Sequence, residues 1–441
     1  MSEDHRGSGS AISVRQRPRL ALGLVAGVFG AAAGAGRQLV AGQESRVAPV
    51  SIATVDALPA EVIPPELGQA ELQVYVPETG HSIRGTMLDY WRATGAASVY
   101  GLPISEPFAS SDGRYSQAFE NAILQFRSDV LWTDDPTVRL FPLGQTAMRA
   151  RLGAFGADGR RTGGGGDRRD FAFRPVDPNG GSAANAWNSG GIYVEATGHT
   201  LTGEFLAFWQ ANEGWFYLGN PISQPFLDRG KRVQYFDGGL LVSDGETARL
   251  APLGRELAAA IGIDTAPIDG SGMTVFDETV FLTSPNPIQQ FDPYAPGSKR
   301  IEVDIAKQQL LAYQGDSLVL STLVSTGLKP NDTELGRFHV RIKYPKQDMG
   351  GFTDSTGEVV SVGDDPTPDA AQPGIRYDVE DVPDVMYINY DAEALHGAYW
   401  HENFGNRMSH GCINLPVEVS AFLYGWAPLG TQVWTHDDTA V

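Results

Sequence analysis

Four residues that can do chemistry lie close together near the end of the 441-residue chain. Three of the eight histidines, His396, His401 and His410, fall within fifteen residues, and the only cysteine follows at Cys412. A thiol attacks a carbonyl carbon well once a base takes its proton, and a histidine on a neighbouring element is a suitable base. Gly411, beside the cysteine, would let backbone N–H groups approach a developing oxyanion. These residues predict a Cys–His acyl-transfer site.

Two other interpretations of the cysteine are weaker. His410 and Cys412 have one residue between them, whereas structural zinc ligands usually have about two to four, and no second cysteine completes a zinc framework. A buried, unreactive thiol is common in proteins, but a polar loop rich in His and Gly does not favour it. We therefore expect neither a metal nor a cofactor. His401 follows Tyr399 and Trp400, so we expect it to line a groove rather than to act in a proton relay.

The residues around the cysteine also form a recognisable motif. Ser409-His-Gly-Cys-Ile-Asn414, preceded by His396-Gly397, resembles the signature of the YkuD-type L,D-transpeptidase family. The similarity extends from about Lys299 to Thr435. Members of that family often have a Thr-Pro-x-Gly stretch where this chain has Thr333-Glu-Leu-Gly336. This departure affects a loop and leaves the expected chemistry in place.

The resemblance implies a role for each residue of the motif. Cys412 would be the nucleophile and His396 the general base, with the backbone carbonyl of Gly397 orienting the imidazole. The other residues would shape the site and its oxyanion hole: Ser409, His410 and Gly411. The implied activity is peptidoglycan crosslinking on tetrapeptide stems through a Cys acyl-enzyme, which a carbapenem would trap. With water as the acceptor the protein would be an L,D-carboxypeptidase, and a wall-binding protein with a vestigial catalytic domain is a further alternative.

The elements that must position these residues are mostly strands. Ile301–Ile305 and Phe338–Ile342 alternate between apolar and polar residues, and Leu310–Ser321 has the pattern of a hairpin. Val417–Trp426, entered through a proline, predicts a short helix, and Gln432–Thr435 a closing strand. The expected fold is mainly β. It has a C-terminal mixed β-sandwich or barrel domain of the L,D-transpeptidase type, preceded by two small α+β repeat modules.

The repeat modules are indicated by five matches that occur in the same order. Tyr75–His81 recurs as Tyr193–His199, and Gly101–Phe108 recurs as Gly219–Phe226, both at an offset of 118 (193 − 75 and 219 − 101). The remaining pairs are Trp91 and Trp209, Gln117–Phe119 and Gln234–Phe236, and Pro142–Gly144 and Pro252–Gly254. We interpret this as a duplication. The pattern resembles the LGFP-type repeats of actinobacterial cell-wall proteins, which implies binding of wall glycan or peptide. His81 and His199 are expected to make structural contacts.

The N-terminal residues predict export. Arg6, Arg15, Arg17 and Arg19 precede an uncharged stretch, Leu20–Gly36, which contains a small-x-small site. This is typical of a secretory signal, and an uncleaved membrane anchor is the alternative. The expected location is the cell wall, the periplasm or the extracellular space, with membrane contact only through an uncleaved N-terminal segment. The formal net charge of −20 argues against a nucleic-acid partner.

A chain of this length is expected to contain several units. Composition and motifs suggest the following division: signal peptide or anchor 1–36, linker 37–70, repeat module 71–152, Gly-rich linker 153–191, repeat module 192–265, linker 266–298 and catalytic domain 299–436. The substrate implied for the last unit is the peptidoglycan stem peptide.

Overall fold

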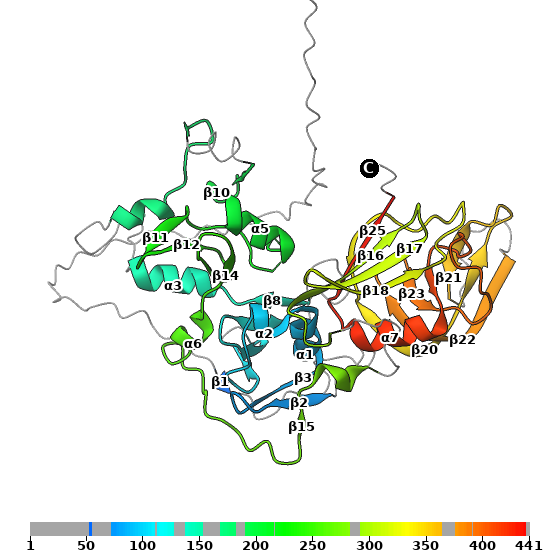
Figure 1. The fold of residues 1–441 in the computed structure, drawn as a ribbon, viewed down its shortest axis with the longest axis horizontal. Helices are drawn as coiled ribbons and strands as arrows, with labels where there is room; N and C mark the ends of the chain where they lie inside the picture. Colours follow the sequence, from blue (N-terminus) through cyan, green and yellow to red (C-terminus); the bar gives the residue numbers. More distant parts are fainter. Residues whose placement is uncertain are drawn as a thin grey trace, which may run out of the picture. The chain divides into compact units, whose positions relative to one another are not determined.

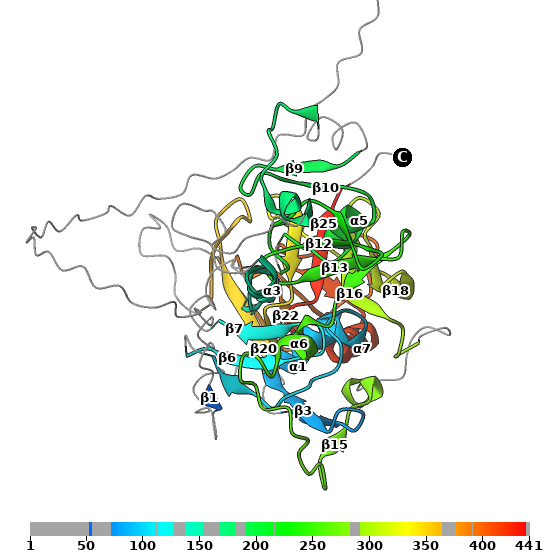
Figure 2. The same cartoon turned by 90° about the vertical axis from the view of Figure 1, so that its left-hand side faces the viewer.

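The computed structural model describes residues 53–54, 72–110, 113–127, 137–152, 168–181, 190–215, 217–282, 292–363, 375–389 and 391–437. The predicted signal segment lies outside these residues. Strands dominate the described ranges and the helices are short (Figures 1 and 2), so the mainly β fold class is confirmed. No helix in these ranges is long and apolar enough to cross a membrane.

Two sheets build the C-terminal segment, one of six strands and one of five; the sixth strand of the first sheet is β4 (Thr94–Gly95), which comes from the first repeat segment and pairs with β16. In the first, the strand order is β18-β17-β16-β25-β19, and the strands are β16 (Gly297–Asp304), β17 (Gln309–Gln314), β18 (Ser317–Leu323), β19 (Gly336–His339) and β25 (Gln432–His436). In the second, the order is β21-β20-β22-β23-β24, and the strands are β20 (Ile342–Thr353), β21 (Val359–Val362), β22 (Ile375–Tyr387), β23 (Ala394–Gly397) and β24 (Ile413–Leu415). The pairs β16–β25 and β23–β24 are parallel.

The local sequence accounts for most of these strands. In β16, Ile301 and Val303 are fully buried, as their alternation predicts. The hairpin of β17 and β18 turns at Gly315, whose φ of +55° suits a glycine. The single strand predicted over Phe338–Ile342 is wrong. The chain leaves the first sheet after His339 and joins the second at Ile342, where it pairs with β22 instead of β25.

One helix, α7 (Val417–Trp426), has the predicted bounds and begins after Pro416. It contacts β22 and β23 (Figure 1). Phe422, Leu423 and Trp426 are fully buried and belong to the same apolar core as the inward side chains of β16 and β24. The helix α7 therefore packs against β23, the strand that carries His396.

The two repeat segments contain similar elements. The first has β2 (Gln73–Val76), β3 (His81–Arg84), α1 (Gly85–Ala93), α2 (Ala96–Val99), β5 (Phe108–Ala109), β6 (Tyr115–Ala118), β7 (Ile123–Phe126), β8 (Val138–Leu140) and α3 (Leu143–Leu152). The second has β9 (Ile192–Val194), β10 (His199–Leu201), α5 (Gly203–Ala211), β11 (Phe226–Asp228), β12 (Lys231–Tyr235), β13 (Leu240–Ser243), β14 (Ala248–Leu250) and α6 (Leu253–Leu257).

Equivalent residues of the two segments make equivalent hydrogen bonds. The indole N–H of Trp91 donates to the Gly101 carbonyl at 3.0 Å, and that of Trp209 donates to the Gly219 carbonyl at 3.0 Å. His81 and His199 are both buried. The duplication and the likeness to LGFP-type repeats both stay predictions.

The last helices of the two segments are exchanged between them. In α3, the backbone and the side chain of Gln145 donate to Asp237 of the second segment, at 3.3 and 2.8 Å. In α6, the backbone and the guanidinium of Arg255 donate to Glu120 of the first segment, at 2.9 and 2.6 Å. Each segment therefore completes the other.

The exchange explains the repeated Pro-Leu-Gly motif. A Cβ at Gly144 would lie 1.8 Å from the carbonyl oxygen of Phe236, and a Cβ at Gly254 would lie 1.9 Å from that of Phe119. Only glycine allows these two helices to approach the opposite segment so closely.

Parts of both predicted linkers are folded. In the first, a 3₁₀ helix (Arg168–Phe173) brings Phe173 to 5.2 Å, between ring centroids, from Tyr235. In the second, β15 (Thr274–Val275) pairs in parallel with β2, and the 3₁₀ helix η5 (Glu278–Phe281) follows. Their aromatic side chains explain this, because burying them favours packing over an extended chain.

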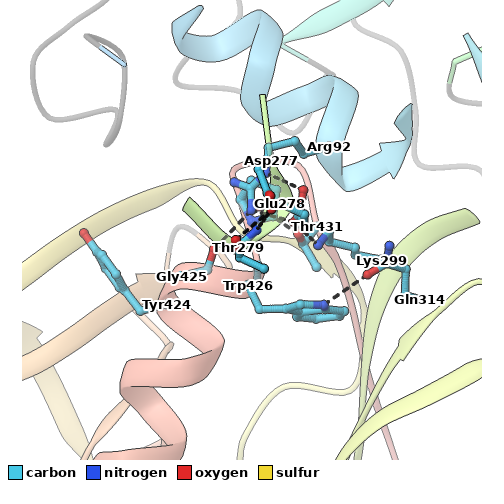
Figure 3. Close-up of polar contacts among 12 residues, drawn as sticks. Arg92, Asp277, Glu278, Thr279, Lys299, Gln314, Tyr424, Gly425, Trp426 and Thr431 are labelled. Atoms are coloured by element: carbon cyan, nitrogen blue, oxygen red, sulfur yellow. Dashed lines mark hydrogen bonds and ion pairs between the residues drawn. The ribbon is translucent and has the colours of Figure 1, made fainter. Parts of the chain in front are cut away.

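The second linker contributes a buried charge to a polar network (Figure 3). Glu278 accepts hydrogen bonds from Arg92 of α1 and from Lys299 of β16, at 2.7 and 2.5 Å. Arg92 also donates to the carbonyl of Gly425 in α7, at 3.2 Å. All three charged side chains are buried. The network therefore joins the first repeat segment, the linker and the C-terminal segment.

Candidate active site

The predicted cysteine and histidine lie on neighbouring strands. Cys412 immediately precedes β24, which pairs in parallel with β23 so that His396 stands opposite Asn414. Side chains two apart on a strand share a face, and directly paired residues do as well. Cys412, Asn414 and His396 accordingly all line one cleft of about 860 Å³, together with Ser409 and His410.

His396 is held as a neutral base. Its Nδ1 lies 3.2 Å from the carbonyl oxygen of Gly397, so Nδ1–H donates there and Nε2 keeps its lone pair. Burial lowers the pKa of His396 to about 4, while the hydrogen bond to Gly397 acts in the opposite direction. The ring can therefore accept a proton at neutral pH. The contact with Gly397 is the one that the sequence motif implied.

Cys412 is held as a thiol. It is partly exposed, and its sulfur lies 3.8 Å from the carbonyl oxygen of Ala392. Burial raises the pKa of Cys412 to about 12; the backbone N–H of Ala394 lowers it and the charge of Glu393 raises it. With His396 neutral as well, the resting pair is thiol and imidazole rather than an ion pair. The nucleophile must therefore form as the base takes its proton.

The loop before the cysteine has a fixed backbone. Gly411 has a φ of +121°, a conformation that favours glycine. Its N–H donates to the Ser409 hydroxyl at 3.2 Å, and its carbonyl accepts from the Thr333 hydroxyl at 2.6 Å. Thr333 in turn accepts from the N–H of Gly327 at 2.9 Å. Thr333 belongs to the stretch Thr333–Gly336, where the sequence departs from the family pattern. This loop therefore holds the backbone of Gly411 in place next to Cys412.

His410 is packed flat against an aromatic ring. Its imidazole stacks on Tyr377 of β22, with the ring centroids 4.6 Å apart and an angle of 16° between the planes. Burial lowers the pKa of His410. Both rings line the cleft, so His410 shapes its wall in this structure.

Glu393 is a site residue that the sequence analysis missed. Its side chain is 8% exposed and lines the cleft beside Cys412. The carboxylate accepts from the backbone N–H of Glu334 at 3.0 Å and from the Asn389 amide at 2.8 Å. Burial raises the pKa of Glu393 to about 7. Nothing in the local sequence distinguishes it from a surface acid, because its burial depends on the loop of Glu334.

Of the aromatic residues that follow His396 as far as Phe404, only Trp400 lines the cleft, so the cleft lining does not include His401, contrary to the expectation from the sequence. Trp400 lies 5.7 Å from the His396 ring and His401 lies 4.9 Å from the Phe404 ring, between centroids. His401 also contacts Asn414, at 2.9 Å. Within the described residues, no group of three or more His, Cys, Asp or Glu side chains is placed to hold a metal ion.

A family comparison covers the segment that contains the cleft. Residues 298–434 match the family model YkuD, described as the L,D-transpeptidase catalytic domain. This segment is a YkuD domain. The cleft strands β23 and β24 and all six predicted site residues fall inside the match. No curated protein matches the chain.

Solved structures similar to the YkuD domain come from several bacteria. The catalytic domain of an L,D-transpeptidase from E. faecium is 25% identical, with 32% of this chain and 97% of that chain covered and a TM-score of 0.25. An L,D-transpeptidase from Mycobacterium smegmatis is 21% identical over 32% and 59%, with a TM-score of 0.24. L,D-transpeptidase 3 from Mycobacterium tuberculosis is 19% identical over 32% and 62%, with a TM-score of 0.24. The chain thus spans about 60% of these mycobacterial proteins.

Proposed function

We propose that the protein is an exported L,D-transpeptidase that crosslinks peptidoglycan stem peptides, with Cys412 as nucleophile and His396 as general base. The observation that supports this proposal is that His396 of β23 and Cys412, which immediately precedes the neighbouring strand β24, line a single cleft of the YkuD domain. Export rests on the N-terminal sequence pattern, and wall binding by the repeat segments rests on their likeness to LGFP-type repeats.

The proposed first half-reaction forms a thioester. The Cys412 sulfur bonds to the carbonyl carbon between the third stem residue and the terminal D-Ala, while its proton passes to Nε2 of His396. The tetrahedral intermediate then expels the D-Ala nitrogen, which takes the proton from His396. Because Nδ1–H of His396 donates to the carbonyl of Gly397, Nε2 takes part in both proton transfers. The backbone around Gly411 would supply the oxyanion donors.

The second half-reaction regenerates the thiol. An amine of a neighbouring stem attacks the thioester carbon and gives its proton to His396, and the departing Cys412 sulfur recovers that proton. Water in place of the amine would give L,D-carboxypeptidase activity from the same acyl-enzyme.

The test is incubation of the full chain with defined disaccharide tetrapeptides, followed by mass analysis of the products. We expect crosslinked dimers and release of D-Ala, and a covalent carbapenem adduct on Cys412. The Cys412→Ala variant is the control and should give neither. Crosslinking that persists in this variant would contradict the proposal. Tripeptide without dimers would instead favour the carboxypeptidase, and sacculus binding without any turnover would favour the wall-binding alternative.

A further inference from the structure

Glu393 is a buried acid of the cleft that neither half-reaction above uses. Its side chain is only 8% exposed and lines the same cleft as Cys412 and His396. A buried charge is unfavourable unless other groups satisfy it. An acid that the fold keeps beside the nucleophile therefore indicates a role in the chemistry of the site.

The fold holds the Glu393 carboxylate against the residue that precedes the nucleophile. A Cβ at Gly411 would lie 3.1 Å from Oε1 of Glu393, so the carboxylate lies against the backbone of Gly411. The backbone N–H of Glu334 donates to Oε1 at 3.0 Å, and the Asn389 amide donates to Oε2 at 2.8 Å. A proline at position 334, as in a Thr-Pro-x-Gly stretch, would have no N–H to donate. The departure of the sequence at Glu334 thus supplies a donor that fixes the acid.

The Glu393 carboxylate can accept further hydrogen bonds. An ionised carboxylate has about four acceptor sites, and the described residues supply two donors, the Glu334 N–H and the Asn389 amide. The described lining of the cleft contains no Lys or Arg, and the charges of Glu334 and Asp391 act to raise the pKa of Glu393. A cationic N–H donor on a ligand would therefore complete this site.

The charge of Glu393 does not help the first half-reaction. Attack by Cys412 develops negative charge on the sulfur and then on the carbonyl oxygen, and a nearby carboxylate disfavours both. Its charge indeed raises the pKa of Cys412. The second half-reaction differs, because an alkyl amine is a cation at neutral pH and must lose a proton before it can attack. A carboxylate beside the thioester is suited to that step.

We propose that Glu393 is the catalytic base for the acceptor: its carboxylate binds the ammonium group of the acceptor stem and takes the first proton from it. The free amine then attacks the thioester carbon, and its second proton passes through Nε2 of His396 to the departing Cys412 sulfur. Glu393 afterwards gives its proton to water. One amide bond forms, one thioester bond breaks and one proton is released. The inference rests on the proposed function for the acyl-enzyme, and it assigns the preference for an amine over water to one residue.

The test is the product ratio of the full chain with a disaccharide tetrapeptide at pH 8, where mass analysis measures crosslinked dimer and hydrolysed tripeptide. Glu393→Gln keeps the size of the side chain but cannot take a proton. We expect the ratio of dimer to tripeptide to fall about tenfold or more, while the carbapenem adduct on Cys412 forms at least as fast as in the parent. Glu402→Gln, an exposed neighbour, is the control and should keep the parental ratio.

The charge of the acceptor separates a base from a residue that only supports the structure. Hydroxylamine is uncharged at neutral pH, so the parent and Glu393→Gln should transfer the acyl group to it equally well. With the tetrapeptide amine, the deficit of the variant should shrink as the pH rises, because more of the amine is then already neutral. A deficit of the same size for both amines and at every pH would overturn the proposal.

A second variant leaves the acid in place and changes only its support. Burial raises the pKa of Glu393 to about 7, and the hydrogen bond from the Glu334 N–H acts to lower it. Glu334→Pro removes that N–H, so the pKa of Glu393 should rise further. The dimer share of the parent should increase as the pH passes through about 7, and in Glu334→Pro the same increase should occur at a higher pH. An unchanged pH profile would overturn the role of Glu393, even if Glu393→Gln fails to fold.

The outcomes distinguish this inference from the proposed function. Glu393→Gln with the parental product ratio would overturn the inference and leave the acyl-enzyme in place. A parent that gives only tripeptide would also overturn it, since no amine is then used. If the parent forms neither product and no carbapenem adduct, the proposed function fails and the inference fails with it.

Discussion

The guanidinium of Arg92 donates two hydrogen bonds to the Glu278 carboxylate, at 3.1 and 2.7 Å, although the two residues are 186 positions apart. Burial acts to raise the pKa of Glu278, but Arg92 and Lys299 together hold it below its ordinary value. The carboxylate therefore stays ionised between two cations, and it connects the first repeat segment to the YkuD domain.

Substitution of Glu278 should destabilise the fold. Glu278→Gln would remove the carboxylate that both buried cations contact, which costs about 3–5 kcal/mol for a broken buried pair. Calorimetry of the full chain should show a lower unfolding temperature for this variant, whereas Glu402→Gln should unfold like the parent. An unchanged transition would mean that water replaces the carboxylate in the network.

The pH dependence of carbapenem acylation should report His396. Because burial lowers the pKa of His396 to about 4, the ring stays an available base down to that pH. The rate of adduct formation, followed by intact mass, should fall only as the pH drops through about 4. His396→Gln should reduce the rate about 10²- to 10⁴-fold, the usual contribution of a general base. If the rate of adduct formation instead fell near the ordinary pKa of histidine, the result would contradict a buried, neutral His396.

Removal of the Glu393 charge should make the thiol more reactive. Glu393 has a pKa raised to about 7, so it is ionised above that pH and raises the pKa of Cys412. Glu393→Gln should therefore increase the rate of alkylation by iodoacetamide at pH 8 by about two- to tenfold. At pH 5 the side chain at position 393 is neutral in both the parent and the variant, so the two should be alkylated at the same rate. An equal increase at both pH values would point to a change of structure instead of charge.

The Thr333 hydroxyl should be required for the loop of Gly411. Thr333→Val keeps the shape of the side chain but leaves the Gly411 carbonyl and the Gly327 N–H without their partner. We expect carbapenem acylation to slow by about tenfold and the stability to fall by about 1–3 kcal/mol. Thr333→Ser keeps the hydroxyl and should restore the rate. If the valine variant acylates normally, the loop does not depend on this bond.

Local patterns predict some of this molecule well. The alternation in Ile301–Ile305 gives β16, and the run after Pro416 gives α7 with its bounds. The proximity of Cys412 and His396 follows from their shared motif. Local patterns could not predict the burial of Glu393, which depends on the loop at Glu334. They also joined β19 and β20 into one strand, because both halves have the same alternation and only the partner strands differ.

Some features depend on residues far apart in the sequence. Nothing near Arg92 or Glu278 in the sequence marks these two residues as partners. Such contacts cannot be read from local sequence patterns, because each hydrogen bond joins residues that are close only in the folded chain.

The exchanged final helices limit how this gene can change over generations. Since Gln145 rests on Asp237 and Arg255 rests on Glu120, loss of one copy would leave the helix of the survivor without its surface. A surviving copy could recover that surface only from a sister molecule, as a dimer. We therefore expect recombination to gain or lose these two modules together.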